Sequence, residues 1–249
     1  MHPVLLRFGS FEIHTYGLLA AAGFFAGILL AQWRAGKDGI AQERITDLGL
    51  WLIVSAMVGA KIFHILFFWD DVVRGWRESG PASLRAGFVF YGGFIGTTLT
   101  VMWYARRKQI PVWKLADILA PSLALGHGLG RLGCFFEGCC YGKACSLPWA
   151  VKFPATLTTV HPTQLYEAAG NFALFGILTT FYRHKRFDGQ VWWLYVIAYA
   201  CLRFTIEFFR GDYATHYFGI FTSAQMIAVV LVVVALVGKF RLESRSRCH

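Results

Sequence analysis

Apolar residues along the 249-residue chain come in seven long blocks, separated by short polar segments. Each block is close to the roughly 20 residues that an α-helix needs to cross about 30 Å of hydrocarbon. The pattern therefore predicts an all-α fold, a polytopic helical membrane protein with about seven transmembrane helices. The predicted helices cover residues 15–33, 46–69, 88–105, 115–135, 164–182, 190–209 and 222–238.

Neither a repeat of fixed period nor a low-complexity linker divides these blocks. The simplest prediction is one transmembrane domain over residues 1–249, with a cysteine-rich periplasmic loop at about 136–162. Composition supports this class, because 56% of the residues are hydrophobic, 15% are charged and the mean hydropathy is +0.49. A soluble domain usually carries about a quarter charged residues.

The basic residues lie mostly at the ends of the apolar blocks. Of the 24 Lys and Arg, 14 fall on one side of the predicted helices and 7 on the other. Because cytoplasmic loops carry the excess of Lys and Arg, we expect a periplasmic N-terminus and a cytoplasmic C-terminus. The net charge of +10 then reflects topology signals and contacts with lipid headgroups, so no nucleic acid partner is expected.

The three remaining basic residues, Lys61, Arg131 and Arg203, lie within predicted helices. A charge inside the hydrocarbon costs several kcal/mol unless it is paired or faces a polar cavity, so its default interpretation is functional. The alternative is that the side chain snorkels to the interface, which is open above all for Lys61. Arg131 and Arg203 have polar neighbours in sequence, which favours a functional role.

Arg131 lies in a glycine-rich run that ends the fourth predicted helix, with Gly126, Gly128, Gly130 and Gly133 around it. So many glycines should make a poor continuous helix. They also let a backbone approach a ligand or a neighbouring helix closely. The planar, permanently charged guanidinium of Arg131 suits a phosphodiester. The run indicates an anionic ligand near the outer leaflet.

The sixth predicted helix carries a second set of polar residues. Tyr199, Arg203, Glu207 and Arg210 have the spacing of one helical face. Two interpretations stay open for Arg203 and Glu207. They neutralise each other inside the bundle, or one arginine contacts a phosphate while the glutamate orients it.

Two further candidates lie at the starts of helices. Pro162 is well placed to begin the fifth predicted helix, and Glu167 then lies about one turn inside it, where a carboxylate needs a partner. Tyr16 enters the first predicted helix. It is either a cavity residue or part of an interfacial aromatic belt.

Four of the six cysteines crowd together, at Cys134, Cys139, Cys140 and Cys145. Outside the cytoplasm such a cluster can form disulfides. The spacing C-x4-C-C-x4-C is not a zinc signature, so a metal site is not expected. A quinone-linked thiol oxidase would also use paired outer cysteines, but it has no evident need for the charged residues above.

Five segments, in order from end to end of the chain, carry a resemblance to a known family. They are IHTYGL at 13–18, FYGGFIG at 90–96, GRLGCF at 130–135, HPTQLYE at 161–167 and RFTIEFFR at 203–210. Together they resemble the motifs of prolipoprotein diacylglyceryl transferases. One G-R-x-G match would be weak, whereas five segments in register are specific.

The resemblance implies a multi-pass enzyme of the bacterial cell inner membrane. Such an enzyme transfers the diacylglyceryl group of phosphatidylglycerol to the lipobox cysteine of a prolipoprotein and releases glycerol phosphate. Its partners are then phosphatidylglycerol, the lipobox of the signal peptide and the bilayer, and no metal or organic cofactor is needed. The substrate-binding residues implied are Arg131, Tyr16, Glu167 and Arg210, and the implied charged catalytic pair is Arg203 and Glu207.

The chain departs from the family pattern at three positions. Tyr91 stands where the family has a histidine, Cys134 replaces an asparagine, and Cys139 replaces a glutamate. The histidine is a natural base for the substrate thiol, whereas a tyrosine with an ordinary pKa of about 10 is a poor base at neutral pH. The candidate catalytic base is therefore Tyr91 itself, His127 one turn before Arg131, or His64.

Three functions follow from these observations. A cysteine-rich branch with the family's activity is favoured, because the anion-binding arginines are all present. The first alternative is a paralogue that binds phospholipid or exports lipid without the transfer. The second is a transporter of lipids or small anions, which inverted repeats would support, and none is visible in the sequence.

Overall fold

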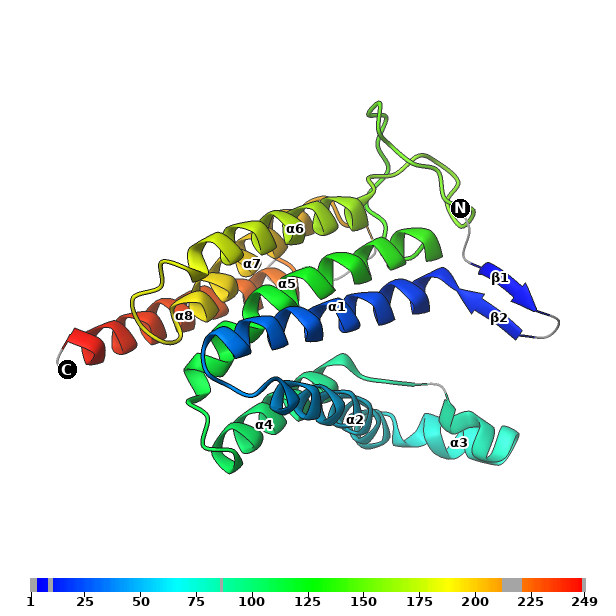
Figure 1. Cartoon of the computed structure of the whole chain (residues 1–249). Helices are drawn as coiled ribbons and strands as arrows, with labels where there is room; N and C mark the ends of the chain where they lie inside the picture. The colour runs from blue at the N-terminus through cyan, green and yellow to red at the C-terminus, as the bar shows by residue number, and fades with distance from the viewer. Residues whose placement is uncertain (1–3, 9–10, 86, 212–220, 248–249) are drawn as a thin grey trace. The chain divides into compact units, whose positions relative to one another are not determined.

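The structure is a computed structural model that describes residues 4–8, 11–85, 87–211 and 221–247. Figure 1 shows its helices and the two-stranded hairpin of β1 and β2. In chain order the elements are β1 (Val4–Phe8), β2 (Phe11–His14), α1 (Thr15–Lys37), α2 (Gln42–Phe67), α3 (Trp69–Ser79), the 3-10 helix η1 (Gly80–Arg85), α4 (Phe90–Arg107), α5 (Val112–Glu137), α6 (Thr163–Tyr182), α7 (Gln190–Glu207) and α8 (Ser223–Arg247).

Each of the seven apolar blocks forms a helix, so α1, α2 and α4 to α8 confirm the predicted helical segments. The β1–β2 hairpin and α3 were not predicted. The hairpin pairs Arg7 with Glu12 in antiparallel register, and its strands are far too short to register as apolar blocks. The 11 residues of α3 alternate Trp and Val with Asp and Arg, so its pattern is amphipathic rather than apolar.

Three of the described helices are long and apolar enough by themselves to cross a membrane: α1, α2 and the Ser223–Ser244 part of α8. Polar residues lower the mean hydropathy of α5, α6 and α7, and several of these polar side chains contact one another. Intramembrane charges characteristically face the interior of a bundle in this way. The protein is a helical membrane protein.

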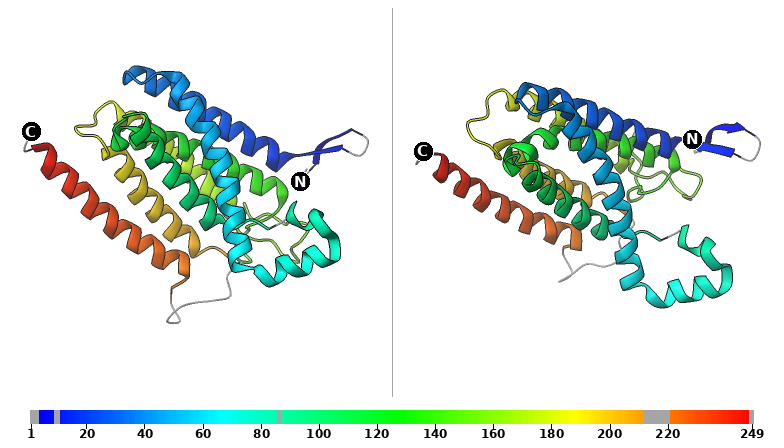
Figure 2. Two further views of the ribbon diagram at one scale, coloured as in Figure 1. Left: turned by 90° about the horizontal axis from the view of Figure 1, so that it is seen from below. Right: turned by 60° about the horizontal axis from the view of Figure 1, so that its bottom comes forward.

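The chain divides into two compact units. The first comprises Met1–Ala31 and Ala116–His249, and the second comprises Gln32–Leu115. In the first unit α7 contacts both α6 and α8 (Figure 1), and Figure 2 shows α8, in red, beside α7. Its hydrophobic core joins Ala120 and Ala124 of α5 to Leu178 of α6 and Val191 of α7.

Close backbone contact joins α1 to α5 within the first unit. A Cβ added at Gly23 would lie 3.0 Å from the carbonyl oxygen of Gly126, and one at Gly27 would lie 3.3 Å from that of Ser122. Glycine permits this approach because it has no side chain to separate the two helices. The contact aligns α1 along the glycine-rich half of α5.

A buried carboxylate fixes the start of α7 at the other end of α5. Asp117 accepts hydrogen bonds from the backbone nitrogens of Gly189 and Trp192, both at 2.9 Å. Lys185 lies 3.4 Å from the same carboxylate. A carboxylate at a helix N-terminus satisfies orphan donors and opposes the helix dipole, so this contact anchors α7 to α5.

The second unit is built on the contact between α2 and α4. A Cβ at Gly59 would collide with the carbonyl oxygen of Gly92, and one at Gly96 would lie 2.7 Å from the carbonyl oxygen of Ser55. The glycines of the FYGGFIG segment thus serve helix packing. Lys61, one of the three basic residues inside a predicted helix, donates to the carbonyl of Gly87 at 3.3 Å.

Candidate active site

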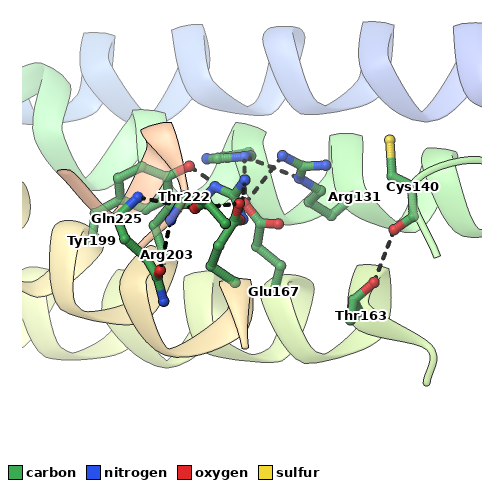
Figure 3. A network of polar contacts seen from close by, with 10 residues as sticks. Arg131, Cys140, Thr163, Glu167, Tyr199, Arg203, Thr222 and Gln225 are labelled. Carbon is green, nitrogen blue, oxygen red and sulfur yellow. Dashed lines mark hydrogen bonds and ion pairs between the residues drawn. The ribbon is translucent and has the colours of Figure 1, made fainter. Parts of the chain in front are cut away.

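A cluster of polar side chains joins α5 to α6 in the first unit (Figure 3). The Arg131 guanidinium lies 3.2 Å from Oε1 of Glu167, and Nε2 of His127 lies 3.4 Å from the same oxygen. The Tyr199 hydroxyl donates to it from α7 at 3.4 Å. The partner that Glu167 was predicted to need is therefore Arg131, with His127 and Tyr199 beside it.

His127 lies between the two charges of this cluster. Arg131 Nε donates to His127 Nε2 at 3.3 Å, and the same nitrogen faces Glu167. A ring nitrogen either accepts a hydrogen bond or carries a proton and donates one. Nε2 accepts from Arg131 when it is unprotonated and donates to Glu167 when it is protonated. One proton on His127 thus decides which of its two charged neighbours it binds.

The second charged pair lies on α7 and reaches the start of α8. Arg203 and Glu207 are 2.7 Å apart, and Thr222 donates to Oε1 of Glu207 at 2.8 Å. The Thr222 nitrogen donates to the Gln225 side chain at 3.0 Å, and the Gln225 nitrogen donates to the Thr222 hydroxyl at 3.4 Å. This reciprocal arrangement is a capping box, and it fixes the threonine that holds Glu207.

Both pairs bury the carboxylate more deeply than the arginine. The side chains of Glu167 and Glu207 are 2% and 1% exposed, whereas those of Arg131 and Arg203 are 19% and 15% exposed. Arg203 also has one guanidinium nitrogen that is buried without a hydrogen-bond partner among the described residues. A ligand that reaches these pairs therefore meets the arginines first, so the pairs suit an anion.

The glycine-rich half of α5 is a continuous helix, and the expectation of a poor helix there is wrong. The described helix runs unbroken from Val112 to Glu137. A Cβ at Gly128 would lie 2.7 Å from the Phe172 ring, and one at Gly133 would lie 3.1 Å from the Tyr16 ring. The packing of these rings offsets the intrinsic cost of glycine in a helix. Tyr16 is 45% exposed beside this surface.

Arg210 does not continue the helical face of Arg203 and Glu207, so that part of the prediction is wrong. Helix α7 ends at Glu207, and Arg210 forms a β-bridge with Gly142 of the loop after α5. The Lys143 nitrogen donates to the carbonyl of Phe209 at 2.8 Å. The chain leaves the helix because this loop takes its backbone bonds. Arg210 itself is buried.

The same loop is held on the first turn of α6. Gln164 donates to the carbonyl of Cys139 at 2.6 Å, and Thr163 donates to that of Cys140 at 2.8 Å. Both side chains are almost fully buried. The predicted helix start at Pro162 is confirmed, since Pro162 is the N-cap residue of α6. The role of Thr163 and Gln164 in positioning the cysteines was not predicted from the sequence.

Three cysteines come together where α5 meets this loop. The sulfur atoms of Cys134, Cys139 and Cys140 all lie within 4.8 Å of one another. A hydrogen bond from Cys134 lowers the pKa of the Cys140 thiol, and Cys139 and the positive charges of Arg131 and Arg210 lower it further. The five cysteines in the described residues are free thiols, and Cys248 lies outside those residues.

Two predicted bases lie in the second unit. Tyr91 is in the first turn of α4, 58% exposed and with its ring against that of Phe90. The His64 ring stacks on Phe68 at 5.6 Å, and its Nδ1 is buried without a hydrogen-bond partner among the described residues. The catalytic role of Tyr91 stays a prediction. His127 is the one of the three candidate bases in the Arg131 cluster.

Thr222 and Gln225 were missed in the sequence. They begin α8 with the pattern T-x-x-Q before an apolar run, which is a sequence signal for a capping box. The pattern predicts the local cap, but the bond from Thr222 to Glu207 depends on how α8 packs against α7.

Comparison with known proteins finds relatives along nearly the whole chain. The family model described as prolipoprotein diacylglyceryl transferase matches residues 3–241. A phosphatidylglycerol–prolipoprotein diacylglyceryl transferase of Clostridium tetani is 33% identical over 95% of this chain and 96% of its own length. Proteins of the same name from Trichormus variabilis and Finegoldia magna are each 31% identical, over 98% and 95% of this chain and 91% and 94% of their own lengths. The chain belongs to the prolipoprotein diacylglyceryl transferase family.

Proposed function

We propose that this protein transfers the diacylglyceryl group of phosphatidylglycerol to the lipobox cysteine of prolipoproteins and releases glycerol phosphate. The names of the relatives support this activity. The observation that carries it is the pair of partly exposed arginines, each backed by a buried glutamate. The retention of both charged segments favours the enzyme over a paralogue that only binds or exports lipid.

In this proposal the phosphodiester of phosphatidylglycerol binds to Arg131 and Arg203. Guanidinium groups form strong, often bidentate hydrogen bonds to phosphate oxygens. Each arginine faces one glutamate, and the buried Arg210 is proposed as a further substrate-binding residue. Glu167 and Glu207 act as positioning residues, and Tyr16 borders the lipid.

The transfer is a displacement at carbon. The lipobox thiolate attacks the glyceryl carbon next to the phosphate oxygen, a C–S bond forms and the C–O bond breaks. The electron pair of that bond leaves with glycerol phosphate, which then carries a second negative charge. Arginines already positioned at the phosphate oppose this growing charge, and removal of one such donor typically costs about 10²–10³ in rate.

The proposal includes a topology. The seven helices α1, α2 and α4 to α8 span the bacterial inner membrane, with the N-terminus in the periplasm and the C-terminus in the cytoplasm. The excess of Lys and Arg on the C-terminal side supports this orientation. The cysteine-rich loop at 136–162 then faces the periplasm, where the lipobox of an exported protein arrives. The two compact units function together as one transmembrane domain.

The direct test is transfer by the purified protein. The protein in detergent is mixed with phosphatidylglycerol and a lipobox peptide, and the mass of the peptide is measured. We expect a diacylglyceryl adduct on the cysteine. In Arg131→Gln the rate should fall by about 10²-fold or more. The matched control Arg186→Gln changes an exposed arginine in the turn after α6 and should keep the wild-type rate.

Absence of any adduct with the wild type, under conditions in which the Clostridium tetani relative forms one, contradicts the proposed function. Binding of phosphatidylglycerol by such an inactive protein would then identify a lipid-binding paralogue.

A further inference from the structure

We propose that Cys134, Cys139 and Cys140 bind one zinc ion, which has an open fourth position for the thiol of the lipobox cysteine. This inference rests on the proposed function, because it assigns the activation of that substrate thiol. The three cysteines are not members of the two arginine–glutamate pairs.

The backbone brings the three sulfurs together although their sequence spacing gives no zinc signature. Helix α5 ends with Gly138 in the left-handed region, at φ +78°, which is a frequent helix stop. The nitrogens of Gly138 and Cys139 both donate to the carbonyl of Cys134, at 3.1 and 3.2 Å. This reversal places the two following cysteines over the last turn of α5, next to Cys134.

The loop is held in an arrangement that local preferences alone do not favour. Cys140 has φ +61°, a conformation that residues with a side chain rarely adopt. Buried side chains hold it there, since Gln164 and Thr163 donate to the carbonyls of Cys139 and Cys140. Backbone in such a region persists only where its surroundings enforce it, and it often marks a functional site.

The sulfur positions suit a zinc ion. Three thiolates around one tetrahedral zinc, at about 2.3 Å from the metal, lie about 3.8 Å apart. The three sulfurs here lie within 4.8 Å of one another, so a closure of about 1 Å or less completes the site. Thiolate ligands select soft or borderline ions such as zinc. Three protein ligands with one open position are the arrangement of catalytic rather than structural zinc.

A zinc ion at this site would activate the thiol of the lipobox cysteine. A thiol coordinated to zinc is deprotonated outright, and metal coordination is an established way to activate a nucleophile. The lipobox thiol takes the fourth position and gives its proton to water. Its thiolate then attacks the glyceryl carbon, the C–O bond to phosphate breaks, and the thioether product leaves the metal. This displacement needs no oxidant or reductant.

The first test measures the metal directly. Protein purified without chelators is exposed to ZnCl₂, dialysed and analysed for zinc and total protein. We expect one zinc per chain, and loss of that zinc in Cys134→Ser, Cys139→Ser and Cys140→Ser. Cys145→Ser is the matched control, because Cys145 is a free thiol of the same loop outside the three-sulfur group, and it should retain the metal.

The second test needs no variant and no turnover. The wild type is loaded with CoCl₂ in place of zinc, and the thiolate-to-cobalt charge-transfer absorption is recorded. Addition of a lipobox peptide with its cysteine should raise this absorption by about one third, from three thiolates to four. The same peptide with serine should leave it unchanged.

Three results would overturn the inference. One is the absence of both bound zinc and the cobalt–thiolate band in the wild type. Another is a disulfide among the three cysteines in protein whose thiols were trapped in the membrane. The third is full transfer by metal-free protein, which would leave the proposed function intact. A cobalt band that responds to the peptide, in a protein that never forms an adduct, supports the zinc site and contradicts the proposed function instead.

Discussion

The α2–α4 contact of the second unit and the α5–α6 contact of the first unit both involve segments that resemble family motifs, but different interactions hold them together. In the second unit α2 and α4 approach through Gly59, Gly92 and Gly96, and their contact consists of backbone carbonyls and glycine carbons. In the first unit α5 approaches α1 through glycine and faces α6 through Arg131 and Glu167. The α2–α4 contact is held by close packing, and the α5–α6 contact also by charge.

This difference shows which motif residues carry chemistry. The glycines of the FYGGFIG segment are required for close packing, whereas the arginine of the GRLGCF segment is held by a buried carboxylate on another helix. A buried ion pair is weak evidence for stability, because desolvation offsets much of its attraction. The presence of the Arg131–Glu167 pair is explained better by an anion that binds to the exposed side of Arg131.

The strongest way to break the α5–α6 contact is to remove the carboxylate. Glu167→Ala leaves the half-buried Arg131 without its carboxylate partner, and loss of one partner from a buried pair typically costs about 3–5 kcal/mol. We expect a loss of this size in the free energy of unfolding, measured by thermal and denaturant unfolding in detergent. The double variant Arg131→Ala/Glu167→Ala should recover part of it. A loss under about 1 kcal/mol would mean that water screens the pair.

The α2–α4 contact should be destabilised by a single added methyl group. In Gly59→Ala the methyl group collides with the carbonyl of Gly92, and such overpacking typically costs about 1–3 kcal/mol. Gly176→Ala is the control, because a Cβ there meets nothing within 4 Å, and alanine should raise helix stability by up to about 1 kcal/mol. Equal melting temperatures for the two variants would contradict the packing role.

A smaller effect is expected at the start of α8. Thr222→Ala removes the N-cap hydroxyl and the hydrogen bond to Glu207, and loss of a cap costs about 0.5–2 kcal/mol. Transfer should fall as well, because Glu207 then positions Arg203 less firmly. Thr222→Ser keeps the hydroxyl and should restore both properties. Recovery of stability without recovery of transfer would mean that the Thr222 cap stabilises α8 but does not position Glu207 for catalysis.

The smallest effect is expected at Tyr91, in the first turn of α4. Tyr91→Phe removes only the hydroxyl of an exposed ring, and an ordinary tyrosine is a poor base at neutral pH. We expect a transfer rate within about twofold of the wild type. A fall of about 10²-fold would identify the tyrosine hydroxyl as a catalytic group and remove the need for another means of thiol activation.

The sequence predicted the helices better than their contacts. Each of the seven apolar blocks forms a helix, because an apolar run of about 20 residues is typical of a membrane helix. The Arg203–Glu207 pair was predictable too, since residues four apart on a helix are neighbours. The pairing of Glu167 with Arg131 was not, because it depends on the packing of α6 against α5.

The remaining errors have the same origin. Glycine content suggested a broken α5, but Phe172 and Tyr16 pack on the glycines and keep the helix continuous. Helical spacing placed Arg210 beside Glu207, but backbone bonds to the loop end α7 first. In each case a contact between distant segments overrides a local preference.

The most direct test of the central claim is the affinity of the purified protein for phosphatidylglycerol, measured by native mass spectrometry. A lost charged hydrogen bond typically costs about 1.5–3 kcal/mol, so Arg131→Gln should weaken binding by about tenfold to a hundredfold. Arg186→Gln should bind as the wild type does. Equal affinity in Arg131→Gln and the wild type would contradict the claim that the α5–α6 charge cluster holds the phosphodiester.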